Sequence, residues 1–150
     1  MKRRSFMAVL LGLPIAAQAQ QRDEFFAEFD ADALAKSATG GVAAKRGRVR
    51  LELPVLADNG NSVSMKVSVE SPMTQADHVR TLRLLSQRNP ERDMAVFHLG
   101  PRAGKAEIVS RVRLAGSQRV VVLAEMSDGS FWMDSADVVV TLSACMDGTG

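Results

Sequence analysis

The stretch Ser62–Glu70, SVSMKVSVE, sets the architecture, because apolar and polar residues alternate in it at every step. Its valines and its methionine therefore share one face, which is the pattern of a half-buried strand. The stretch Arg48–Leu53, RVRLEL, alternates in the same way. Between the two, Asp58–Asn61 supplies residues that tolerate a positive φ, so the sequence predicts a tight connection there.

Further apolar runs continue toward the C-terminus, separated by turn signals such as Ser71-Pro72, Asn89-Pro90 and Asp128-Gly129. The predicted strands are 79–85, 94–99, 106–114, 119–126 and 130–142, the last with an interruption near 134–136. Short strands at regular spacing, without long helices between them, favour two packed antiparallel sheets. We therefore predict an all-β, immunoglobulin-like antiparallel sandwich of about seven strands over residues 47–142.

The segment 20–46, which precedes the predicted sandwich, has a different period. Over Arg22–Lys36 the phenylalanines recur at helical spacing beside acidic residues, which predicts an amphipathic helix. Gly40-Gly41 is expected to end it, and the basic stretch 45–48 connects it to the first strand. Because its polar side is acidic, we expect the phenylalanine stripe to pack on the domain rather than on a membrane.

Residues 1–19 have the zones of a cleavable export signal. Lys2–Arg4 is positive, Met7–Ala17 is a short apolar run, and Ala17-Gln18-Ala19 predicts cleavage after Ala19. The apolar run is shorter than the roughly 20 residues that a membrane-spanning helix needs, so no permanent anchor is expected. Arg3-Arg4, followed by Ser5 and Phe6, resembles the twin-arginine signal of proteins that fold before export.

The net charge of the chain changes once this signal is removed. Three of the 19 lysines and arginines lie in it, which leaves 16 against 17 aspartates and glutamates. The mature chain is then close to neutral and lacks the excess of positive charge that nucleic-acid binding requires. Its 131 residues are enough for one domain with its own core, and a single cysteine excludes an internal disulfide.

No assembled catalytic set, phosphate loop or metal-ligand spacing is present, so no catalytic residue, metal or cofactor is predicted. His78 and His98 are the only histidines, and neither stands at ligand spacing with a cysteine or carboxylate. We interpret each as an ordinary surface or strand histidine. Trp132 is interpreted as a core or sheet-face residue.

Cys145, the only cysteine, follows the last predicted strand in an arm over 143–150 that also contains Gly148 and Gly150. Small residues and glycines near a chain end predict a flexible, exposed arm. Position alone leaves two interpretations open, a thiol with a function or one that is incidental or forms an intermolecular disulfide. Because Asp147 and the terminal carboxylate disfavour thiolate, any reaction at Cys145 is expected inside a partner's active site.

Several blocks of the sequence, taken together, resemble the SoxY family of sulfur-oxidation carrier proteins. They are DNGNSV at 58–63, SPMT at 71–74, NP at 89–90, GKAE at 104–107, RLA at 113–115, AEMSDG at 124–129 and VVVTL at 138–142. The resemblance implies a periplasmic protein with an immunoglobulin-like fold that crosses the membrane folded, in a heterodimer with SoxZ.

The same resemblance implies a role for Cys145 as the covalent attachment residue. In the family the SoxAX cytochrome joins thiosulfate oxidatively to the cysteine of the arm, SoxB releases sulfate, and SoxCD oxidises the remaining sulfur. The carrier itself catalyses nothing. This arm departs from the family pattern of flanking glycines: Ser143-Ala144 precedes the cysteine, Met146-Asp147 follows it, and Gly148-Thr149-Gly150 extends it. We therefore expect a divergent carrier that loads thiosulfate poorly or serves another partner or sulfur species.

Two other functions stay open at this point. One is a non-catalytic binding or scaffold subunit whose sheet face pairs with a partner and whose cysteine is idle. The other is a cofactor-free enzyme, which ranks last because no catalytic set is assembled.

Overall fold

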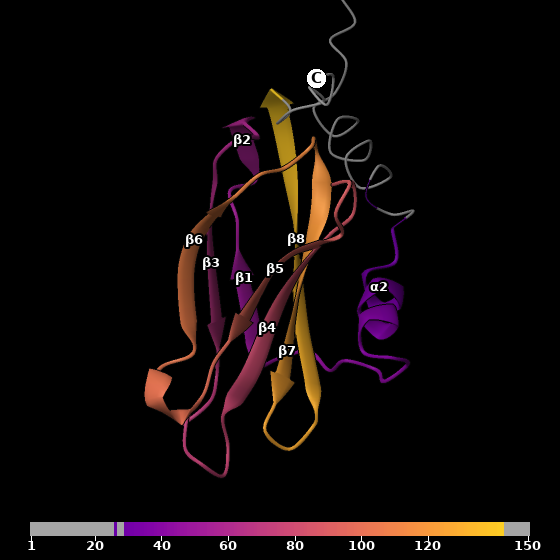
Figure 1. Cartoon of the computed structure of the whole chain (residues 1–150). Helices are drawn as coiled ribbons and strands as arrows, with labels where there is room; N and C mark the ends of the chain where they lie inside the picture. The colour runs from indigo at the N-terminus through magenta and orange to yellow at the C-terminus, as the bar shows by residue number, and fades with distance from the viewer. Residues whose placement is uncertain (1–25, 27–28, 143–150) are drawn as a thin grey trace, which may run out of the picture.

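The structure, a computed structural model, describes Phe26 and residues 29–142. Over this part it includes a short α-helix, a 3-10 helix (η1, Pro101–Ala103) and eight strands in two facing sheets (Figure 1). The elements are α2 (Ala31–Ala38), β1 (Val49–Glu52), β2 (Leu56–Asn59), β3 (Val63–Val69), β4 (Val79–Ser86), β5 (Asp93–His98), β6 (Glu107–Val112), β7 (Gln118–Met126) and β8 (Phe131–Leu142). One sheet has the order β1-β3-β6 and the other β2-β8-β7-β4-β5. The predicted β-sandwich is thereby confirmed.

The core lies between the two sheets, on the faces that the alternating pattern marks as apolar. Val63, Met65, Val67 and Val69 of β3 are buried there, while the residues between them are more exposed. β7 is buried on both faces, which explains its nearly continuous apolar run. Its outward residues Val121 and Leu123 are covered by α2, which lies against the outer face of the larger sheet (Figure 1).

The prediction of a continuous helix over Arg22–Lys36 is wrong in one respect, because Phe29 and Asp30, between the helical Phe26 and α2, are not helical. α2 begins at Ala31, because Asp30 is extended and its carboxylate accepts the Ala33 N–H at 2.9 Å as an N-cap. It ends at Ala38, and the Gly41 N–H bonds back to the Lys36 carbonyl at 2.9 Å, so the predicted stop at Gly40-Gly41 is confirmed. Over the described part, no helix has the length and apolarity to cross a bilayer.

The phenylalanine stripe packs on the domain, as its acidic neighbours predicted. Phe26 is buried, and Phe29 packs against the cluster beneath α2. Phe25 and the export signal 1–19 lie outside the described residues.

β2 is a strand that the sequence did not predict, and it is not antiparallel. Asp58 and Asn59, assigned to a connection, belong to it, and it runs parallel to β8 with Leu56 opposite Val139. After β1, the chain leaves the smaller sheet and forms β2 at the edge of the larger sheet. The turn into β3 is therefore shorter than predicted and is closed by the Asn59 side chain, which accepts the Asn61 N–H at 2.9 Å.

The predicted interruption of the last strand near 134–136 is wrong, because β8 is continuous. Its polar residues have partners that lie far away in the sequence. Asp134 accepts the Leu51 backbone N–H at 2.8 Å, and Asp137 forms an ion pair with Arg119 at 2.6 Å. The first bond gives the backbone N–H of Leu51, in β1, an acceptor on β8. Asp134 therefore links a strand of the smaller sheet to a strand of the larger one.

Replacing Asp134 with alanine is expected to lower the free energy of unfolding by about 1.5 kcal/mol, because the Leu51 N–H loses its acceptor. Urea unfolding of the variant measures this change. Asp134→Asn keeps an acceptor oxygen and is the matched control, expected to retain most of the stability. Equal losses in both variants would show that the hydrogen bond is not the cause.

Candidate functional site at the root of the C-terminal arm

The predicted attachment residue Cys145 and the glycines Gly148 and Gly150 lie outside the described residues. The structure does describe the strand that leads to them, up to Leu142. Cys145 follows Leu142 by three positions in the sequence, so the end of β8 is the described part of the chain that precedes it most closely.

The end of β8 is held firmly on both sides. The Gly60 N–H donates to the Leu142 carbonyl at 2.7 Å, and the Thr141 hydroxyl donates to the Asp58 carbonyl at 2.9 Å. The Val140 N–H donates to the Ser117 hydroxyl at 2.9 Å. We call this end of β8, with Asp58–Gly60 and Ser117, the arm root; β2 lies beside this end of β8 (Figure 1). Its hydrogen bonds fix the point from which the arm departs.

A buried polar network lies beside the arm root. Ser86 and Gln118 are both 0% exposed, and the Ser86 hydroxyl donates to the Gln118 side-chain oxygen at 2.6 Å. The Gln118 amide nitrogen donates to the side chain of Asn89 at 2.9 Å, which also accepts the Ala115 N–H at 2.9 Å. The network therefore ties the β4–β5 and β6–β7 connections together next to the last strand.

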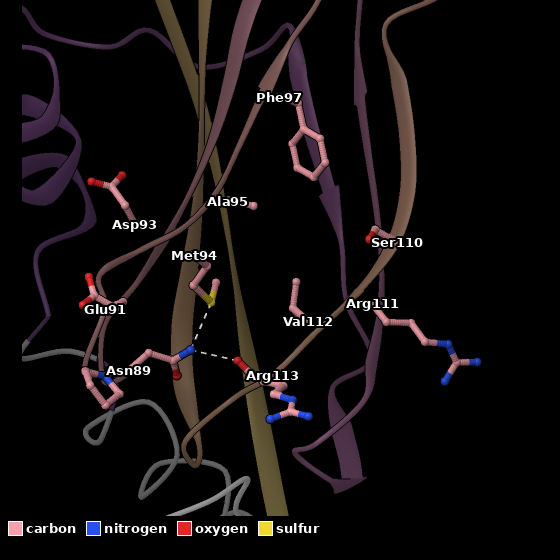
Figure 2. A pocket seen from close by; sticks show the side chains of 11 residues that line it. Asn89, Glu91, Asp93, Met94, Ala95, Phe97, Ser110, Arg111, Val112 and Arg113 are labelled. Carbon is pink, nitrogen blue, oxygen red and sulfur yellow. Dashed lines mark hydrogen bonds between the residues drawn. The ribbon is translucent and has the colours of Figure 1, made fainter. Parts of the chain in front are cut away.

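A groove of about 510 Å³ opens between β5 and β6, which are edge strands of the two sheets (Figure 2). Met94, Phe97 and Val112 give it an apolar floor. Its charged lining residues are Glu91, Asp93, Arg111 and Arg113. The Asn89 amide nitrogen bonds to the Met94 sulfur at 3.3 Å and the Arg113 carbonyl at 2.8 Å, so the polar network reaches this groove.

The other residues considered from the sequence lie elsewhere. His98 ends β5 and is exposed, and the His78 ring bonds to the Thr74 carbonyl at 3.0 Å. Trp132 is half-buried against the core, with the Lys45 ammonium 5.7 Å and the Arg48 guanidinium 5.5 Å from its ring centre. Within the described part, no group of three or more histidine, cysteine or acidic residues could hold a metal.

Sequence reasoning missed the arm root and its polar network. Asn89-Pro90 was assigned only to a turn, and Gln118 was left just outside a strand. A polar side chain directly before the apolar run 120–124 is the one signal that could have marked Gln118 as a buried hydrogen-bonding residue.

Comparison with protein families decides what kind of protein carries this arrangement. The family model described as "Sulfur oxidation protein SoxY" matches residues 35–145, about three quarters of the chain. The chain belongs to the SoxY family. Its match spans the whole sandwich and ends at Cys145 itself.

Solved structures share the fold. The sulfur carrier protein SoxY from Chlorobium limicola f thiosulfatophilum aligns at 20% identity and a TM-score of 0.60, covering 80% of this chain and 99% of that one. A superoxide reductase (neelaredoxin) from Ignicoccus hospitalis aligns at 17% identity and 0.56, covering 72% and 86%. A putative superoxide reductase from Thermotoga maritima aligns at 18% and 0.56, covering 65% and 93%. No curated protein sequence matches the chain.

Proposed function

We propose that this SoxY family member is a sulfur carrier that holds its cargo covalently on Cys145 and presents it to partner enzymes. The observation that carries the proposal is the family match, which runs through the sandwich to this cysteine. Two facts support it: Cys145 is the only cysteine, and the hydrogen-bonded strand before it ends three residues away. A strand end that is held by hydrogen bonds suits a cysteine that must be presented to other proteins.

The loading chemistry needs an external oxidant. The Cys145 thiol and the terminal sulfur of thiosulfate form an S–S bond while the thiol loses its proton and the pair loses two electrons, which a cytochrome partner accepts. Hydrolysis of the product by a second partner releases sulfate and leaves a persulfide on the cysteine. Each step uses groups that the partner supplies, so the carrier contributes a thiol, its position and its surroundings.

The proposal includes a location and partners taken from the family. The chain acts in the periplasm after folded export by the twin-arginine route and pairs with a SoxZ-type sandwich protein. SoxAX, SoxB and SoxCD act on it transiently. Because Asp147 follows the cysteine so closely, thiosulfate, an anion, is expected to load less readily here than on an arm of glycines.

Mass spectrometry of the mature protein, incubated with thiosulfate and its loading cytochrome, tests the proposal. The expected result is a thiosulfate adduct on the peptide that contains Cys145, formed more slowly than on a SoxY with a glycine-flanked cysteine treated in parallel. If that second SoxY is loaded and this chain carries no adduct, thiosulfate is not its cargo.

A further inference from the structure

β6 is an edge strand with one free side. It pairs with β3, and within the described part of the chain no strand lies on its other side. Backbone N–H and C=O groups along that side have no strand partner, and such an edge is a template for pairing with a further strand. The middle of β6, Ile108–Ser110, includes neither a charge nor a proline. Val109 is 73% exposed, the highest value among the large apolar side chains of the described part.

The other edge strands are less suited to take a partner strand. In β1, the Leu51 N–H already donates to Asp134 of β8. β2 has only four residues, and short edge strands discourage pairing with another chain. In β5, the one acidic or basic residue other than a histidine is Asp93, which already pairs with Arg83 at 2.9 Å. Two copies of β5 therefore could not form a pair of opposite charges between lysine or arginine and a carboxylate.

The sequence of β6 is complementary to itself when two copies run antiparallel. One register places Val109 opposite Val109 of a second copy, and the same register places Glu107 opposite Arg111. These three residues share one face of the strand, because side chains alternate. A two-fold axis repeats the charge pair, so opposite charges meet twice across the junction. Opposite charges directly across a sheet stabilise it, and like charges there destabilise it.

The charges of β6 can make these contacts. Arg111 is exposed and donates to the Ser62 hydroxyl at 3.1 Å, but it forms no ion pair within the described part. Glu107 pairs with Lys105 at 3.2 Å and with Lys66 at 3.6 Å, in both cases through Oε2. A carboxylate accepts up to about four donors, so Glu107 has room for a further guanidinium.

We propose that two copies of this chain associate by antiparallel pairing of β6 in the register centred on Val109. The two smaller sheets then form one sheet with the order β1-β3-β6-β6-β3-β1. Lys105 and Arg113 face each other in this register, but both are exposed and lie beyond the ends of the strand, so their repulsion is weak in water. The proposal depends neither on the carrier function nor on Cys145.

The groove between β5 and β6 is covered by the same association. Met94 of β5 and Val112 of β6 lie on its two sides, and Phe97 adds to its apolar floor (Figure 2). These side chains pack against the core but are only half-buried. The inward side chains of the second β6 extend this apolar layer over the mouth of the groove. Pairing therefore covers apolar surface on both faces of the strand.

Analytical ultracentrifugation of the mature chain in reductant tests the proposal. Reductant removes any dimer held by a disulfide of the single cysteine. The expected result is a reversible equilibrium between monomer and dimer in the micromolar range. If a protein of another sequence occupies this edge instead, the chain alone stays monomeric up to the millimolar range, and that result would overturn the proposal.

Two charge reversals test the register. Glu107→Arg and Arg111→Glu each turn both opposite-charge pairs into like-charge pairs, so each variant alone is expected to dissociate at least about tenfold more readily. An equimolar mixture of the two variants should recover the affinity of the wild type. In the mixed dimer, the new arginine faces the new glutamate, and the native Arg111 of one copy faces the native Glu107 of the other.

Two valine variants distinguish the two edges of the groove. Val109→Lys places two lysines opposite each other and should weaken the dimer at least about tenfold. Val96→Lys is the matched control, because Val96 is an exposed valine on β5, and this variant should associate as the wild type does. Circular dichroism tests whether each variant is folded. Folded charge variants whose mixture stays monomeric, or equal weakening by both lysine variants, would contradict pairing through β6.

Discussion

Replacing Cys145 with serine is expected to abolish covalent loading completely, because the chain has no second thiol. Serine keeps the size of the side chain but its hydroxyl forms no stable bond to sulfur under these conditions. The free energy of unfolding should change by less than about 0.5 kcal/mol, since the residue follows the hydrogen-bonded part of β8. Mass spectrometry after incubation with thiosulfate and the cytochrome measures the first effect, and urea unfolding measures the second.

Ser143→Ala is the matched control, because it changes the same arm without touching the thiol. It should load as the wild type does. The Cys145→Ser variant also separates a carrier from a scaffold whose cysteine is idle. A carrier loses sulfur oxidation in the reconstituted pathway and keeps its partner, whereas full activity of the serine variant would establish the scaffold.

The sandwich was predictable wherever one face of a strand is buried and the other is not. In β3 the alternation of valine and serine carries this information locally, and burial follows it residue by residue. β4 and β7 were predictable for a related reason, because β-branched and leucine-rich runs bounded by turn residues have few alternatives. A short stretch of sequence is thus enough to predict which segments form strands.

The pairing of strands was not predictable in the same way. β2 has four residues, two of them polar, and its stability comes from β8, more than 80 positions away. The polar residues of β8 suggested a break, yet the partner of Asp134 is the backbone of Leu51. When a side chain bonds to a backbone group that is distant in the sequence, the residues next to it in the sequence do not indicate that partner.

The candidate site was likewise predictable only in part. Cys145 could be selected from the sequence because it is unique and stands after the last strand. The arm root could not be predicted in this way, since it joins segments near residues 60, 117 and 142. Leu114 is unremarkable in the sequence, and only the fold links it through Gly60 to Leu142. Position in the chain identified the candidate reactive group, and the fold alone identifies what holds the strand before it.

Replacing Gln118 with alanine is expected to lower the free energy of unfolding by about 3 kcal/mol. Its side-chain oxygen accepts both the Ser86 hydroxyl, at 2.6 Å, and the Arg88 N–H, at 3.1 Å. Both donors would lose this acceptor, and truncation of a side chain that is 0% exposed would leave a cavity. Urea unfolding measures the loss, which is large against the roughly 5–15 kcal/mol that stabilises a domain.

Gln118→Met fills the space without supplying an acceptor, so it separates the cavity from the hydrogen bonds. A double-mutant cycle with Ser86→Ala should give a coupling of about 1 kcal/mol or more, because each side chain satisfies the other. The Asn89 N–H donates to the Ser86 hydroxyl at 2.8 Å, and the Ala115 N–H donates to the Asn89 side chain at 2.9 Å. Hydrogen exchange should accelerate most at these two amides. Additive energies and unchanged exchange would show that these connections are held by other contacts, and that the arm root does not depend on this network.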